Sequence, residues 1–163
     1  MTRSIDKMDY ETAAKYLTNV IAECPASIKH IVLKIECLLK VPNIDEALSY
    51  TESLMRNPQY TSNPSIVGWR GRALIYSGNE AQGQKFLKES LRLDPDNQEV
   101  KQALKNVKFM SEKKDEASKL FKDGKYKEAI AKFNECVAID ELNVIYNATI
   151  YFNIALCKSK YHY

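Results

Sequence analysis

The sequence predicts an all-α fold built of helix pairs that repeat along the chain. The clearest pair lies in residues 111–140, SEKKDEASKLFKDGKYKEAIAKFNECVAID, where two amphipathic helices flank a turn at Gly124. The second of these helices carries apolar side chains at the i, i+4, i+7, i+8 spacing of one helix face: Ala129, Phe133, Cys136 and Val137. A small residue recurs in the same register at positions 13, 47, 83 and 129, so the unit repeats.

The chain is predicted to begin part-way through a repeat. Residues 1–7 are too few for a complete first helix, and residues 9–25 are expected to form only the second helix of a pair. The apolar face of that helix is Ala13, Leu17, Val20 and Ile21. The next repeat spans residues 27–58, with helices over 27–40 and 44–56. Its inward-facing residues are expected to be Ile31, Ile35 and Leu38.

A third repeat is predicted over residues 64–95. Asn63 and Pro64 are typical of a helix start, because asparagine caps the first turn and proline is tolerated at the first helical position. Gly78 is expected to end that helix, since glycine readily adopts the positive φ of a helix stop. The second helix of this repeat should cover residues 80–93.

A fourth repeat, over residues 96–140, is predicted to contain an extended first helix. No Gly or Pro interrupts residues 97–122, so this stretch should form one helix of roughly 39 Å at 1.5 Å per residue. Asp96 and Glu99 resemble a capping pair at its start. The second helix of the repeat is expected over residues 126–139.

The last predicted element, over residues 147–163, is the first helix of a further repeat. The chain ends before the partner of this helix, so we expect the array to be cut at both ends, with more sequence on either side. In total the sequence predicts eight helices and no strand, in a single array over residues 1–163.

The repeats resemble the tetratricopeptide repeat (TPR) family over nearly the whole chain. The first spacing between the small residues equals the 34-residue TPR period, the second is two residues longer, and the third carries a twelve-residue insertion. The resemblance implies a right-handed helix-turn-helix solenoid that binds protein ligands on a concave surface lined by the first helix of each pair.

A finer resemblance rests on three segments. These are CPASIKHIVLKIECLL, the long helix inserted before KKDEASKLFKDGKYKEAI, and NATIYFNIALCKSK. Together they are similar to the second half of the TPR region in the co-chaperones of DnaJ homolog subfamily C. That family combines TPR groups, which engage Hsp70 and Hsp90 tails, with a J domain. This sequence has no HPD motif of a J domain, so the resemblance covers the TPR portion alone.

The resemblance also implies a partial site for the C-terminal carboxylate of a partner peptide. In the family register this site would contain Lys114, Ser118 and Asn153, and Lys122 would add charge one turn beyond Ser118. Ser118 stands where the family has asparagine, and the Lys/Arg pair of the next first helix would lie beyond the last residue. The alternative is that Lys114 belongs to the solvated run EKKDE and that Asn153 is an ordinary polar residue.

The sequence does not indicate an enzyme, a metal site or a cofactor. It has no GxSxG, Walker, HExxH or Gly-rich phosphate motif, and its two histidines, His30 and His162, lie far apart. The four cysteines lack metal-site spacing, so we expect buried free thiols in a cytoplasmic protein: Cys24, Cys37, Cys136 and Cys157. No apolar run is long enough to span a membrane, and no signal peptide is evident.

The sequence therefore predicts a protein-interaction scaffold that binds an Hsp70 or Hsp90 tail. A spacer array that positions other modules without binding is the first alternative, and an RNA-binding helical repeat is the second. The formal charge of +3, with acidic and basic residues interspersed, argues against nucleic acid. Trp69 and Tyr76 are expected to pack or to line the groove wall. The expected core residues include Leu38, Ile75, Phe121 and Phe133.

Overall fold

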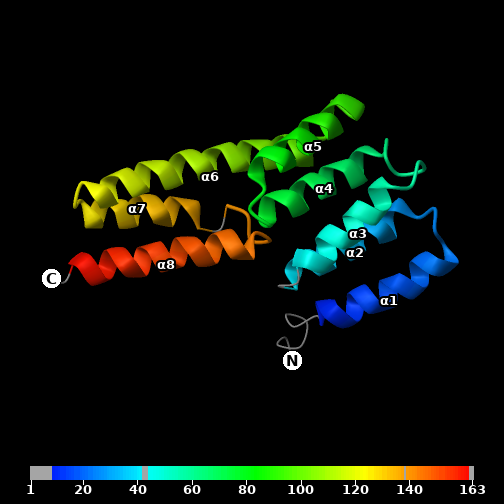
Figure 1. Cartoon of the computed structure of the whole chain (residues 1–163), viewed down its shortest axis with the longest axis horizontal. Helices are drawn as coiled ribbons and strands as arrows, with labels where there is room; N and C mark the ends of the chain where they lie inside the picture. Colours follow the sequence, from blue (N-terminus) through cyan, green and yellow to red (C-terminus); the bar gives the residue numbers. More distant parts are fainter. Residues whose placement is uncertain (1–8, 42–43, 138, 162–163) are drawn as a thin grey trace. The chain divides into compact units, whose positions relative to one another are not determined.

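The computed structural model describes residues 9–41, 44–137 and 139–161, which form eight helices and no strand (Figure 1). This confirms the all-α prediction. The helices are α1 (Tyr10–Glu23), α2 (Ile28–Lys40), α3 (Ile44–Met55), α4 (Pro64–Tyr76), α5 (Glu80–Leu93), α6 (Gln98–Lys122), α7 (Tyr126–Cys136) and α8 (Val144–Tyr161). They fall into two compact units, unit 1 (Met1–Val100) and unit 2 (Lys101–Tyr163). The single array over the whole chain stays a prediction.

Polar side chains start several of the helices. Asn63 accepts a hydrogen bond from the Ile66 amide at 3.2 Å, with Pro64 in the first turn, as predicted for α4. The predicted stop at Gly78 is also present, with a φ of +90°. The predicted cap of α6 is wrong by one residue: Asn97, not Asp96, accepts from the Val100 amide, at 3.1 Å. A cap reaches the amide three residues ahead, so a helix that begins at Gln98 uses Asn97.

The predicted bounds around residues 137–147 are also wrong. The α7 helix ends at Cys136 rather than at residue 139, because Val137 has an extended backbone with a ψ of 139°. The α8 helix begins at Val144, three residues before the predicted start. Buried Asn143 accepts from the Tyr146 amide at 3.2 Å and so caps the earlier start. Residues 162 and 163, in the predicted last helix, lie outside the described residues.

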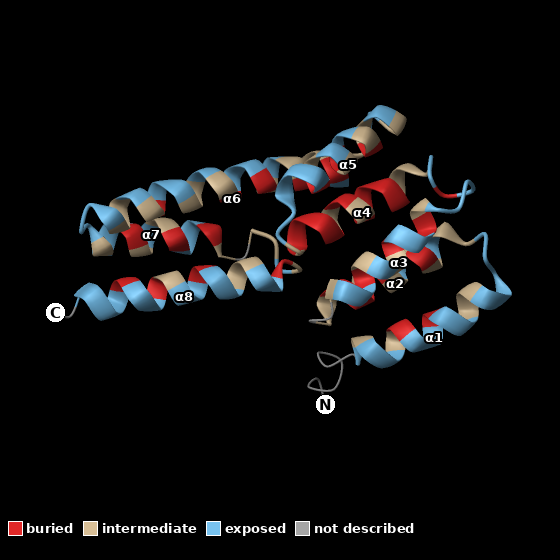
Figure 2. Cartoon of the chain, in the orientation of Figure 1, coloured by how far each residue is buried: buried red, intermediate tan, exposed pale blue. Residues whose placement is uncertain are grey.

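Unit 1 is organised around α4, where nine of the thirteen residues are buried (Figure 2). This helix packs against α2, α3 and α5. Hydrogen bonds tie neighbouring elements together: the Tyr60 hydroxyl donates to the Pro25 carbonyl at 2.6 Å, and Arg70 Nη1 donates to the Leu48 carbonyl at 2.7 Å. Because these bonds link residues far apart in sequence, they set how the helices pair.

Unit 2 has its own core where α6, α7 and α8 meet. Its fully buried or nearly buried residues are Ala117, Ala129, Phe133, Cys136, Ile150, Ile154 and Cys157. The Tyr146 hydroxyl donates to the Met110 carbonyl at 2.9 Å, which ties α8 to α6. Of the predicted core residues, Phe133 is buried here and Leu38 and Ile75 are buried in unit 1, whereas Phe121 is only partly buried.

The prediction for the cysteines holds for three of the four. All are free thiols, and Cys37, Cys136 and Cys157 are buried, but Cys24 is exposed. Cys24 follows directly after the last residue of α1, at the start of the turn that leads to α2. Burial raises the pKa of the other three thiols, so little reactive thiolate forms on them near neutral pH.

We therefore expect iodoacetamide to modify the native protein once, at Cys24. Intact-mass spectrometry over time should show a single adduct forming quickly and three more only after denaturant is added. Cys24→Ser should remove the fast adduct and leave the other three unchanged. A second adduct on Cys37, Cys136 or Cys157 at the rate of the first would contradict the packing described above.

Candidate peptide-carboxylate site

Three of the four predicted site residues line one pocket of unit 2. Ser118 and Lys122 lie one turn apart on α6, and Asn153 lies on α8. An apolar wall completes the pocket, which has a volume of about 130 Å³: Phe121, Phe133 and Leu156. We call these six residues the unit 2 pocket. Residues 35 positions apart in sequence, Ser118 and Asn153, thus share one small cavity.

The polar groups of the unit 2 pocket differ in what they can offer a ligand. Asn153 is partly exposed, and its amide makes no hydrogen bond within the described part of the chain. Lys122 is exposed and forms no ion pair with any described residue. The Ser118 hydroxyl donates its single hydrogen to the Lys114 carbonyl of its own helix at 2.7 Å. The pocket therefore offers one free amide and one free ammonium group as donors.

Lys114 is the predicted residue that does not line the unit 2 pocket. Its Nζ lies 6.0 Å from the centroid of the Tyr146 ring, at the outer limit of a cation–π contact. It nevertheless shares one face of α6 with Ser118 and Lys122, since the three are spaced at i, i+4 and i+8. Lys114 therefore extends the cationic side of α6 without entering the pocket.

The neighbours of Lys114 in the charged run are engaged with α7. Lys113 Nζ lies 3.0 Å from Glu116 Oε2 and 3.6 Å from Glu135 Oε2, and Lys132 Nζ lies 2.9 Å from Glu135 Oε1. A hydrogen bond from Lys132 lowers the pKa of Glu135, and one to Glu116 raises the pKa of Lys113. Lys113 and Glu116 thus belong to an inter-helix ion-pair network, while Lys114 forms no ion pair among the described residues.

No acidic side chain lines the unit 2 pocket among the described residues. A single carboxylate could therefore enter without repulsion from the wall, and an aliphatic side chain beside it could cover the apolar wall. Charge-assisted hydrogen bonds from an amide and an ammonium group are the interactions that hold a carboxylate most strongly. The arrangement suits a ligand with a carboxylate next to an apolar side chain.

Two aromatic residues predicted to pack or to line a groove wall lie in unit 1. Tyr76 is buried, and Trp69 is 8% exposed in the wall of a pocket in unit 1. No group of three or more His, Cys, Asp and Glu side chains that could hold a metal occurs within the described ranges. In the same ranges, no helix has both the length and the apolar content that crossing a membrane requires.

Comparison with known proteins shows what this chain is similar to. No protein-family model matches it. Human DnaJ homolog subfamily C member 7 is 29% identical over 155 residues, which cover 95% of this chain and 31% of the human protein. Its homolog from Schizosaccharomyces pombe is 31% identical over 124 residues, or 76% of this chain and 25% of that protein. The chain thus spans a third or less of the length of these curated relatives.

A solved structure agrees with these relatives. The crystal structure of the P58(IPK) TPR domain superimposes with a TM-score of 0.60 and 22% identity, over 96% of this chain and 43% of that one. This likeness shows the fold, an all-α TPR solenoid. Together with the sequence relatives, it confirms that the chain resembles the TPR region of co-chaperones of the DnaJ subfamily C type.

Proposed function

We propose that this chain is a protein-interaction segment of a co-chaperone and that its unit 2 pocket binds the acidic C-terminal tail of Hsp70 or Hsp90. The observation that carries the proposal is the joint lining of one cavity by Ser118, Lys122 and Asn153 beside an apolar wall. The DnaJ-type relatives and the TPR fold support a role in protein interaction. The free thiols are in keeping with a cytoplasmic location, which we also propose.

In this proposal the terminal carboxylate of the tail contacts the Asn153 amide and the Lys122 ammonium group. The aliphatic residue next to the terminus packs on Phe121, Phe133 and Leu156. Further carboxylates of the tail are attracted by Lys114, on the same face of α6. Ser118 contributes little, because its hydrogen already bonds to the carbonyl of Lys114. With few donors and an exposed Lys122, affinity for the tail should be weak.

The test of this proposal is a substitution that should raise the affinity of the unit 2 pocket for the tail. Ser118→Asn adds a two-donor amide at the position where the co-chaperone family has asparagine. We therefore expect a peptide ending in EEVD to bind the Ser118→Asn chain about tenfold more tightly than it binds the unaltered chain. Titration calorimetry measures the affinity, and NMR shifts should locate the peptide on α6 and α8. Lys114→Ala and Asn153→Ala in the Ser118→Asn background should each weaken the gain.

Two controls separate this site from nonspecific attraction. Ser159→Asn makes the same change at an exposed position of α8 outside the pocket, and it should leave affinity unchanged. A peptide with an amidated C-terminus should bind poorly to every variant, because it lacks the terminal carboxylate. If Ser118→Asn brings no gain, or amidation no loss, the carboxylate site is wrong and the spacer alternative is favoured. Sub-micromolar, salt-sensitive binding of RNA would instead favour the nucleic-acid alternative.

A further inference from the structure

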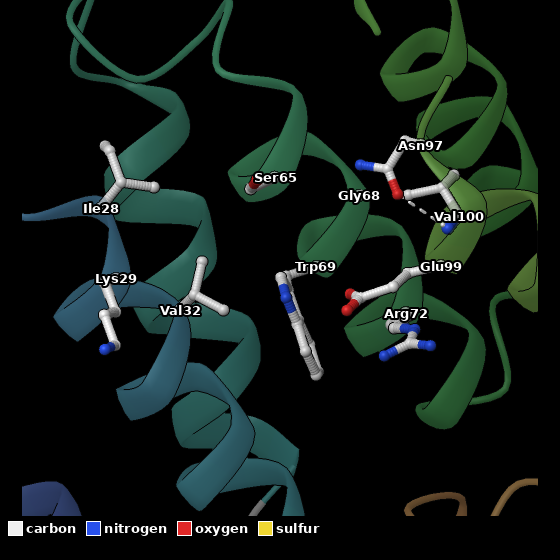
Figure 3. A pocket seen from close by; sticks show the side chains of 10 residues that line it. All are labelled: Ile28, Lys29, Val32, Ser65, Gly68, Trp69, Arg72, Asn97, Glu99 and Val100. Carbon is white, nitrogen blue, oxygen red and sulfur yellow. Dashed lines mark hydrogen bonds between the residues drawn. The ribbon is translucent and has the colours of Figure 1, made fainter. Parts of the chain in front are cut away.

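Unit 1 contains a second and larger pocket, with a volume of about 290 Å³, between α2, α4 and the first turn of α6. We call it the unit 1 pocket. Ile28 and Val32 of α2 face the Trp69 ring of α4, and Arg72 of α4 and Glu99 of α6 lie on the other side of that ring (Figure 3). Lys29 lies at the rim on α2. The pocket thus combines an apolar interior with three charged side chains.

The charged side chains of the unit 1 pocket have no ionic partner of their own. Neither Arg72, Lys29 nor Glu99 forms an ion pair or a side-chain hydrogen bond with any described residue. Arg70, two residues before Arg72, differs in this respect, because it donates to the Leu48 carbonyl and to Thr51 Oγ1. Arg70 is therefore used to hold α3 and α4 together, while the hydrogen-bond donors of Arg72 remain available.

Trp69 holds the Arg72 guanidinium group in place. The guanidinium carbon lies 4.7 Å from the centroid of the indole ring, within the range of a cation–π contact. Trp69 itself is 8% exposed, so neighbouring residues cover most of its ring. A guanidinium group held in this way loses little side-chain entropy on binding and presents a planar fork that matches a carboxylate.

We propose that the unit 1 pocket is a peptide-binding site for an acidic residue flanked by aliphatic residues in a partner protein. The carboxylate of that residue binds Arg72, and the aliphatic side chain packs between Val32, Ile28 and Trp69, while Lys29 adds positive charge on the α2 side of the pocket (Figure 3). The unit 1 pocket has two positively charged side chains, Arg72 and Lys29, and one negatively charged side chain, Glu99. This small excess of positive charge favours a ligand group with a single negative charge. A polyphosphate chain is disfavoured, because Glu99 in the wall repels closely spaced anionic charges. The site shares no residue with the unit 2 pocket.

The protein offers a built-in probe for this site, because Trp69 is its single tryptophan. The blocked peptide GSELELESG contains no aromatic residue and no free terminus, so changes in emission come from Trp69 and the terminal-carboxylate site is not engaged. We expect a saturable change in Trp69 emission on titration into the intact chain. Anisotropy of the same peptide carrying a fluorescent label gives the affinity. The matched peptide GSQLQLQSG should bind markedly more weakly.

Variants of opposite effect make the test independent of folding. Arg72→Gln should weaken binding of GSELELESG about fivefold, whereas Glu99→Gln should tighten it about twofold, since one removes an attractive charge and the other a repulsive one. Arg56→Gln is the matched control: Arg56 is exposed directly after the end of α3, outside the unit 1 pocket, and pairs with Glu52, so its loss should leave affinity unchanged.

Three results would overturn the proposal. The first is an absence of any change in Trp69 emission at saturating peptide, and the second is equal affinity for the Glu and Gln peptides. The third is a shift of affinity in the same direction for Arg72→Gln and Glu99→Gln. Binding of a nine-nucleotide oligouridine that displaces GSELELESG at physiological salt would assign the pocket to nucleic acid instead.

Discussion

Gly83→Ala is expected to destabilise unit 1 by about 3 kcal/mol, although alanine favours a helix by about 1 kcal/mol over glycine. A Cβ at position 83 would lie 2.6 Å from the carbonyl oxygen of Gly71 and 2.5 Å from Cγ1 of Ile75. Because one of these neighbours is backbone, α4 and α5 must move apart. That movement loses contacts along α4, the most buried helix of unit 1.

Chemical denaturation followed by circular dichroism, together with hydrogen exchange of α4 and α5, measures this effect. Gly78→Ala is the matched control: no heavy atom lies within 4 Å of a Cβ there, but the φ of +90° strains any L-residue. It should cost only about 1 kcal/mol. Equal stabilities of the Gly83→Ala and unaltered chains would show that α4 and α5 do not approach as closely as described.

Phe133→Ala is expected to unfold much of unit 2, because it removes the largest fully buried side chain of that unit. Phe133 is 2% exposed and packs in the core where α6, α7 and α8 meet. Loss of a buried phenylalanine costs about 3–5 kcal/mol from lost burial and the cavity left behind. The free energy of unfolding of a unit of this size is little larger than this loss.

Phe152→Ala provides the matched control on α8, since Phe152 is 68% exposed. It should change stability by less than about 0.5 kcal/mol. Hydrogen exchange in α7 and α8 should be fast for Phe133→Ala and unchanged for Phe152→Ala, and far-ultraviolet circular dichroism should lose helix signal in the first variant alone. Retention of native exchange rates in Phe133→Ala would mean that this core does not hold the three helices together.

Most of the helices could be predicted from the sequence because their signals are local. The start of α4 at Asn63 and Pro64, and the stops at Gly78 and Gly124, follow from the conformations that these residues favour. Apolar periodicity located the buried faces, including Ala47, Gly83 and Ala129. In α1 Leu17 is buried as predicted, and Ala14 is buried where Ala13, of intermediate burial, was expected to be.

The region between α7 and α8 depended on tertiary structure. No Gly or Pro marks the end of α7, so periodicity alone continued the helix to residue 139. In the structure the loop carbonyls are held from outside the helix: Asn147 Nδ2 donates to the Asp140 carbonyl at 3.0 Å, and Asn106 Nδ2 donates to the Ile139 carbonyl at 3.3 Å. Such bonds join residues up to 33 positions apart, and no local pattern encodes them.

The sequence by itself determined the all-α repeat fold and the candidate residues of the carboxylate site, because helix periodicity and family register are both carried by short stretches of chain. Only the tertiary structure decided which of those residues meet. It brought Ser118, Lys122 and Asn153 into one pocket and left Lys114 outside it. It also brought Trp69, Arg72 and Glu99 together in a pocket that no sequence motif predicted. The physical reason is that a pocket depends on how helices distant in sequence pack, which is set by contacts such as Tyr146 with Met110 rather than by local preference.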